Sequence, residues 1–228
     1  MFDIRRIQVH SLREFFKEFL MIVVGILTAI TIEHYYTLSH KRHLAEKAAE
    51  QVHLEIKANL ESATQGIADN QKNIDTFVAL EQGIVADLEA KLGREQLIAS
   101  LEKRMDGHYG IGAHVIEPAQ DAWDAAIASQ AVVHMEASEL QAFSRLYATQ
   151  RAITSDLAGY QQAMRTVTWS HWNSVITDLQ FHRVDAVEFL KALREYTGNL
   201  RVLNSKMTAY RNALVKADEG MRSKQRQH

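Results

Sequence analysis

The segment Phe19–Ile32 reads FLMIVVGILTAITI and contains no charged side chain. A helix needs about 20 predominantly apolar residues to cross the hydrocarbon core of a bilayer, so these residues alone are too few. Aromatic side chains extend the apolar stretch on both sides, from Phe15 to Tyr36. A helix of that length measures about 33 Å. The sequence therefore predicts one N-terminal transmembrane helix over residues 15–36, preceded by a short arm of residues 1–14.

Long cationic and aromatic side chains flank this apolar segment. Such side chains reach the headgroup region of a bilayer while their stems remain against apolar surroundings. The residues that we expect at the two membrane interfaces are Lys17, Tyr35, Tyr36, Lys41 and Arg42.

Two other interpretations of the segment are a cleaved signal peptide and a buried core helix. A signal peptide also combines a basic start with a short apolar run, but it ends at a small-x-small cleavage site. Here the run ends in Thr-Ala-Ile-Thr-Ile-Glu33, and the helical pattern continues into Tyr35. A buried core helix is rarely so apolar at the start of a chain. An uncleaved anchor is the interpretation that we prefer.

The orientation of the anchor follows from the cations on its two sides. The cations before the span are Arg5, Arg6, Arg13 and Lys17, and those soon after it are Lys41, Arg42 and Lys47. Four against three favours a cytoplasmic N-terminus by the positive-inside rule. A short arm followed by a large domain is also the usual layout of bacterial signal-anchor proteins. We therefore expect a single-pass protein of the bacterial inner membrane, with residues 37–228 in the periplasm.

The composition predicts an all-α fold. The 228 residues include a single proline, Pro118, and ten glycines, so residues that break helices are scarce. No segment alternates polar and apolar residues as a strand does. The formal charge of −2 gives no argument for a nucleic-acid partner. The absence of cysteine excludes disulfides, thiolate metal sites and thiol nucleophiles.

Two long helices are predicted in the domain after the anchor, over about 38–92 and 170–221. Apolar residues recur by sevens in both, which is typical of helices packed along a seam. Seam positions of the first are Leu60, Ile67, Ile74, Leu88, Ala63, Phe77 and Ile84, and those of the second include Trp172, Leu179, Ala186, Leu193, Leu200, Met207 and Leu214. The polar residues Asn70, Glu81 and His182 interrupt these seams. We prefer antiparallel pairing within one chain, as a long-helix bundle or antiparallel coiled coil, and a homodimeric coiled coil is the alternative.

Shorter helices are expected between the two long ones. They cover residues 94–105, 119–129 and about 138–165, and the last begins at Ser138-Glu-Leu-Gln141, a capping-box pattern. The segment 106–118 between them contains Gly107, Gly110 and Gly112 and is expected to be a loop.

Several stretches of the sequence share a pattern with one known family. They are Phe15–Ala29, the charged stretch Glu55–Glu61, Trp123-Asp124, Ser129, Val132-Val133, Glu139-Leu140 and Tyr147. On these residues the chain resembles, over roughly residues 12–150, a family of bacterial single-span membrane proteins known only as a domain of unknown function. The family commonly has glycine where this chain has Gln130. The resemblance implies a membrane anchor and a helical domain, and it implies no activity.

Few residues suggest chemistry. Glu50 and His53 form an E-x-x-H pair, as used in di-iron bundles, but such sites need a second pair and two further carboxylates. No nucleophile elbow, zinc-protease motif or phosphate loop is present. Trp169 and His171 lie beside the seam residue Trp172 and are candidate partner contacts.

These observations favour a membrane-anchored helical interaction or scaffold protein of the bacterial envelope. Its expected partners are the lipid bilayer and either another protein or a second copy of the chain. No catalytic residue, metal ligand or cofactor is predicted. A ligand-sensing helical bundle that acts through a partner is the first alternative. A metal-dependent bundle enzyme around Glu50 and His53 is the second.

Overall fold

The computed structural model describes residues 12–105 and 112–225, and this part of the chain is helical without any strand. The α-helices are α1 (Leu12–Glu89), α2 (Arg94–Met105), α3 (Asp121–Ala128), α4 (Ala137–Ala163), α5 (Trp169–Gln180) and α6 (Ala186–Gln225). A 3₁₀-helix, η1 (Ala131–His134), precedes α4, and a π-helical segment, η2 (Met164–Thr168), joins α4 to α5. The predicted all-α fold with a long apolar N-terminal helix is confirmed.

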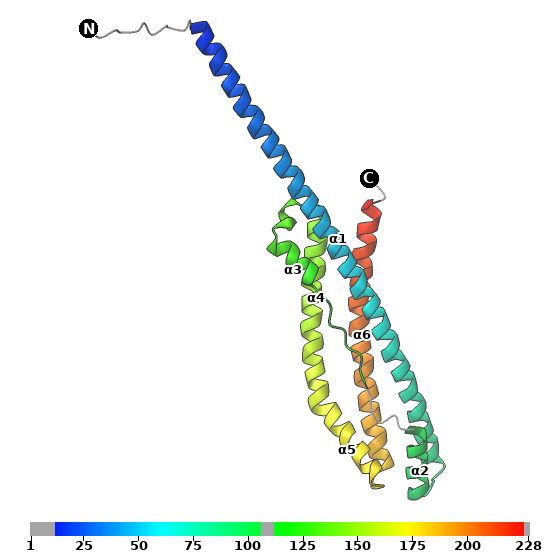
Figure 1. Cartoon of the computed structure of the whole chain (residues 1–228). Helices are drawn as coiled ribbons and strands as arrows, with labels where there is room; N and C mark the ends of the chain where they lie inside the picture. The colour runs from blue at the N-terminus through cyan, green and yellow to red at the C-terminus, as the bar shows by residue number, and fades with distance from the viewer. Residues whose placement is uncertain (1–11, 106–111, 226–228) are drawn as a thin grey trace, which may run out of the picture.

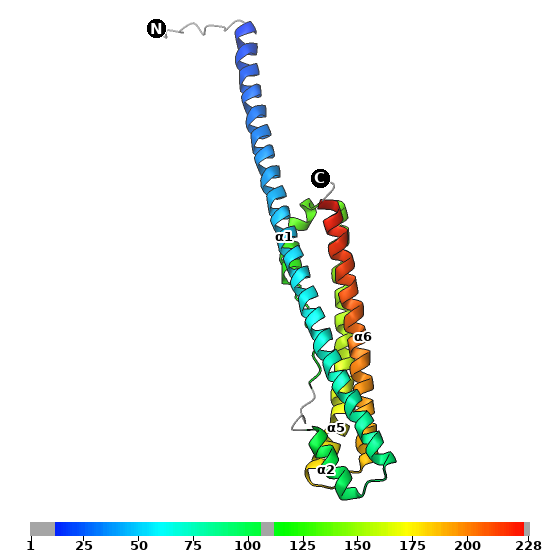
Figure 2. The same cartoon turned by 90° about the vertical axis from the view of Figure 1, so that its right-hand side faces the viewer.

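Helix α1 is one element with two different parts. It contains 78 residues, which corresponds to about 117 Å. Its first part projects beyond all other helices (Figures 1 and 2). From Ala45 onward one side of α1 is buried, beginning with Ala49, Val52 and Ile56. The same helix therefore leaves an apolar segment uncovered and then enters the core.

Helices α1, α4 and α6 lie side by side over most of the remaining length, and α6 runs in the direction opposite to α1 (Figures 1 and 2). Cross-helix contacts give the register: the rings of Phe77 and Tyr196 meet edge to face at 5.6 Å, and Arg194 Nε donates to Glu81 Oε1 at 2.7 Å. The seam positions of α6 fill the core. Leu193, Tyr196, Leu200, Leu203, Met207, Tyr210 and Leu214 are almost completely buried.

The prediction of one continuous C-terminal helix over 170–221 was wrong. Helix α5 ends at Gln180, His182 has a φ of 55°, and α6 begins at Ala186. Asp185 caps α6, since its Oδ1 accepts hydrogen bonds from the backbone N–H groups of Val187 and Glu188, each at 2.9 Å. Helices α5 and α6 thus form a hairpin, and Trp172 of α5 packs on Phe189 and Tyr196 of α6.

Other helix ends also differ from the prediction. The N-cap of α4 is Glu136, whose carboxylate accepts from the backbone N–H of Glu139 at 3.1 Å, while the expected cap Ser138 lies inside the first turn. Helix α1 ends at Glu89 and not near residue 92, since Lys91 has a φ of 53°. Gln130 also has a positive φ, 59°, a backbone conformation that glycine adopts most readily.

Asparagine side chains on α1 hold the connection between α2 and α3. Asn70 Nδ2 donates to the carbonyl of His114 at 2.8 Å, and Asn70 Oδ1 accepts from the His114 N–H at 2.8 Å. Asn59 makes the same pair of hydrogen bonds with Ala119, at 2.8 and 2.9 Å. We call these two pairs the asparagine clamps.

The spacing of the clamps explains the shape of the connection. Asn59 and Asn70 are eleven residues apart on a helix, which is about 16 Å. Five residues of extended chain, from His114 to Ala119, span nearly the same length, about 16 Å. The connection must therefore run extended along α1. Gly66 leaves space for it, because a Cβ atom there would lie 2.4 Å from Cδ2 of His114.

Replacing Asn70 by alanine is expected to lower the free energy of unfolding by about 2–4 kcal/mol, because two partly buried backbone groups of His114 lose their partner. Asn73 is the matched control: it is half-buried and donates one hydrogen bond, to the exposed carbonyl of Gly112. Asn73→Ala should cost less than about 1 kcal/mol. Urea unfolding of the full chain in lipid nanodiscs, followed by circular dichroism, measures both, and equal costs would contradict the clamp.

Candidate functional site

The largest uncovered apolar surface is the first part of α1. An 18-residue window of this helix has a mean hydropathy of 2.0, and none of the window is buried. One helix near the N-terminus is thus long and apolar enough to cross a membrane. The alternative of a buried core helix is wrong, because no described residue covers this segment. We call residues 15–38 the apolar segment.

Polar atoms inside the apolar segment are satisfied within the helix itself. The hydroxyl of Thr28 donates to the carbonyl of Val24 at 2.8 Å, and that of Thr31 donates to Leu27 at 2.7 Å. Hydroxyl groups bonded in this way need no water, which suits an apolar solvent such as a lipid bilayer.

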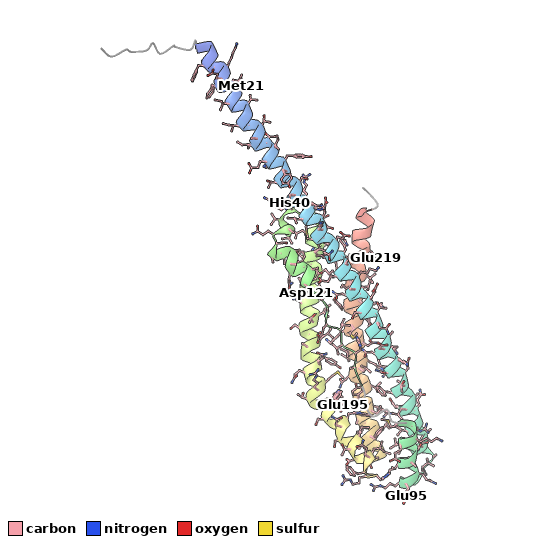
Figure 3. All side chains as sticks on the ribbon, viewed as in Figure 1. Met21, His40, Glu95, Asp121, Glu195 and Glu219 are labelled. Carbon is pink, nitrogen blue, oxygen red and sulfur yellow. The ribbon has the colours of Figure 1, made fainter. Side chains whose placement is uncertain are left out.

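The predicted interface residues Lys17, Tyr35, Tyr36, Lys41 and Arg42 all lie on α1 and are exposed. Lys17 and Tyr35 are eighteen residues apart, which is about 27 Å along a helix and close to the thickness of a hydrocarbon core. Figure 3 shows Met21 on the projecting part of α1 and His40 where the other helices begin. The interface residues therefore stand at the two ends of the apolar segment.

The two candidate partner contacts differ in their surroundings. Trp169 is the first residue of α5 and is 43% exposed. His171 is bound from both ring nitrogens by carboxylates of α6: Nδ1 lies 3.0 Å from Glu195 Oε2, and Nε2 lies 3.1 Å from Glu188 Oε1. Glu188 also pairs with Lys191 at 3.1 Å. His171 thus links α5 to α6, while Trp169 remains accessible.

Further hydrogen bonds fix the helix that precedes Trp169. Thr168, the last residue of η2, is buried, and its hydroxyl donates to Glu195 Oε1 at 3.2 Å. The same hydroxyl accepts from Asn199 Nδ2 at 2.7 Å, and Tyr160 donates to the Asn199 carbonyl at 2.7 Å. These bonds tie the joint between α4 and α5 to α6.

Glu50 and His53 do not form a site together. His53 Nε2 lies 3.2 Å from Glu139 Oε1 of α4, and its ring meets Phe143 edge to face at 5.3 Å, while Glu50 is exposed. Among the described residues, no three His, Asp or Glu side chains are grouped so that they could hold a metal ion.

A polar cluster around Glu55 was not predicted. Its carboxylate accepts from the Tyr147 hydroxyl at 2.5 Å and from the backbone N–H of Ala122 at 2.8 Å, and Trp123 stacks on Tyr147 at 5.3 Å. Burial and the neighbouring carboxylate raise the pKa of Tyr147 far above its ordinary value, so the phenol stays neutral. The cluster joins α1, α3 and α4. The sequence signal was Trp123 and Tyr147, but nothing in it indicated Glu55 as their partner.

No protein-family model, no curated protein and no solved structure matches this chain. The resemblance to the single-span family therefore stays a prediction.

The paired carboxylates make the contribution of His171 to stability depend on pH. Hydrogen bonding to Glu195, with a further contribution from Glu188, raises the pKa of the imidazole above 6.5 in the folded chain. The stabilisation is then complete below about pH 6.5, the unfolded value, and is lost as the pH rises through the higher folded pKa.

Relative to His171→Ala, the native chain should therefore lose up to about 1 kcal/mol of unfolding free energy on passing from pH 6 to pH 8, the usual size for partly exposed ion pairs. Urea unfolding at several pH values measures this difference. A difference that stays constant, or that grows with pH, would contradict the pairing.

Proposed function

We propose that this chain is a single-pass membrane protein of the bacterial envelope whose helical domain serves as an interaction or scaffold module. The observation that carries the proposal is the apolar segment, which no described residue covers and which continues without a break into the packed part of α1. Exposed apolar surfaces of this extent mark contact with a membrane or a partner. An apolar segment about as long as a bilayer is thick, with no charged side chain over residues 19–32, fits a membrane better than a protein groove.

The continuous helix gives the domain a defined reach. Residues 37–89 of α1 correspond to about 78 Å, and Glu95 lies at the end of the molecule opposite Met21 (Figure 3). The proposed module is an intramolecular antiparallel helical bundle, supported by the buried seam of α6 and its contacts with α1. Such a body would present long helical faces to a partner at a fixed distance from the bilayer. That partner is another protein or a second copy of the chain.

The proposed topology places the N-terminus in the cytoplasm and residues 37–228 in the periplasm of a bacterial inner membrane. It is supported by the cations before the span and by the size of the domain after it. A ligand-sensing role through a partner is a second candidate, since a pocket described below lies between three parts of the helical domain.

Membrane insertion is tested by two substitutions on the same helix. Ile26 and Leu54 are 54% and 55% exposed, but only Ile26 lies in the apolar segment. A lysine near the bilayer centre costs about 2.5–3.5 kcal/mol. We expect the native chain and Leu54→Lys to resist carbonate extraction from membranes, and Ile26→Lys to be released in a substantial fraction. Release of the native chain, or a mature N-terminus near Thr31, would overturn the anchor.

The topology is tested by labelling, because the chain contains no cysteine of its own. Ser170 is exposed on α5, and Ser11 belongs to the N-terminal arm. In intact cells whose outer membrane is permeable, a maleimide that cannot cross the inner membrane should label Ser170→Cys fully. It should label Ser11→Cys only after lysis. The reverse pattern would invert the proposed topology.

A further inference from the structure

A pocket of about 310 Å³ lies where the extended connection, the joint between α4 and α5, and helix α6 meet. Most of its lining is apolar. The lining residues are Ala113, Val115, Gln161, Met164, Arg165, Trp169 and Leu203. This volume is at the lower end of the range of about 300–1,000 Å³ that is usual for small-molecule sites.

The first wall is fixed by the clamp at Asn70. That residue holds both backbone groups of His114, and the imidazole of His114 lies against Gly66 of α1. In an extended chain, alternate side chains point to opposite sides. Ala113 and Val115 therefore both face away from α1 and line the pocket. The hydrogen bonds between Asn70 and the backbone of His114 thus hold the side chains of Ala113 and Val115 in defined positions.

The second wall depends on the π-helical segment. Met164 and Trp169 are five residues apart and would point to different sides of an α-helix. The wider π turn, whose hydrogen bonds join residues i and i+5, brings them to one side. Thr168 anchors this segment to α6 through Glu195 and Asn199, as described above. Single π turns occur frequently at functional sites.

The pocket combines an apolar interior with one cation. Arg165 forms no hydrogen bond or ion pair with any described residue, whereas Arg104 pairs with Asp87 and Arg194 pairs with Glu81. The partly exposed ring of Trp169 and the side chain of Gln161 lie beside it in the lining. A guanidinium group suits a carboxylate, which it binds through two parallel hydrogen bonds.

We infer that this pocket binds a small amphiphilic carboxylate, with its apolar chain against Met164, Val115 and Leu203 and its carboxylate at Arg165. Membrane lipid is not the expected source. Leu203 precedes Asn204, which contacts Gln71 of α1, and Gln71 lies thirty-five residues beyond Tyr36, about 52 Å along the helix. The ligand must therefore reach the pocket through water, which favours a short chain.

The inference is tested with sodium octanoate, and 1-octanol serves as the uncharged probe of similar length. Full-length protein in nanodiscs is titrated by calorimetry and by tryptophan fluorescence, with empty nanodiscs subtracted for partition into lipid. We expect saturable heat with octanoate, accompanied by a fluorescence change that Trp169→Phe abolishes. Arg165→Gln should weaken octanoate binding about tenfold and leave octanol binding unchanged. Arg151→Gln, an exposed cation earlier on α4, is the matched control and should change neither.

Several outcomes would overturn the inference. Absence of saturable heat in the native chain excludes the site. Equal octanoate binding by the native chain and Arg165→Gln excludes the role of the cation, and a fluorescence change that persists in Trp169→Phe places binding elsewhere. Ala113→Phe, which fills the pocket from the connection, should remove binding of both probes while the helical circular dichroism is retained. Membrane insertion is tested separately, by carbonate extraction.

Discussion

The structure depends on one constraint: the single helix α1 leaves an apolar segment uncovered and also packs into the core of the helical domain. Residues 19–32 of α1 carry no charged side chain and find no packing partner among the described residues, whereas beyond Ala45 the helix buries one side and exposes the other. Helix α1 continues without a break, so its apolar side from Ala45 to Ile84 must be covered by other helices along that whole length. Helix α6 runs back along α1 and supplies most of that cover, while α2, α3 and η1 also pack on α1 and α4 packs mainly on α6.

The same constraint explains the polar residues within the seam. A connection of extended chain has backbone groups that must be bonded when they lie against a helix, and a fully apolar stripe on α1 offers no partners. Asn59 and Asn70 supply both a donor and an acceptor at two points whose spacing matches extended chain. Asn70 therefore sets the position of the connection, and the side chains of Ala113 and Val115 follow from it.

The sequence predicted the elements better than their joints. Helical periodicity identified α1 and α2 to within a few residues, and it identified the buried side of α6, because packing along a helix leaves a repeat of sevens. The same repeat led to a wrong prediction at residues 181–185. Leu179 and Ala186 are seven residues apart and fit one continuous helix, but the chain breaks between them and Asp185 caps the new helix α6. Trp169 and His171 were predicted as candidate partner contacts because they lie beside the seam residue Trp172, and that role stays a prediction. Their partners Glu188 and Glu195, and the π turn before them, depend on contacts with α6 that no local pattern encodes.

The joint between α4 and α5 is irregular, and several hydrogen bonds connect it to α6. Thr168, His171 and Tyr160 each bond to α6, so the π turn is maintained by three separate contacts outside its own helix. Trp169 lies between two of them and faces a pocket instead of the core. Because Glu195 accepts from both Thr168 and His171, a ligand that moved Trp169 would disturb the α5–α6 pair before it disturbed α1.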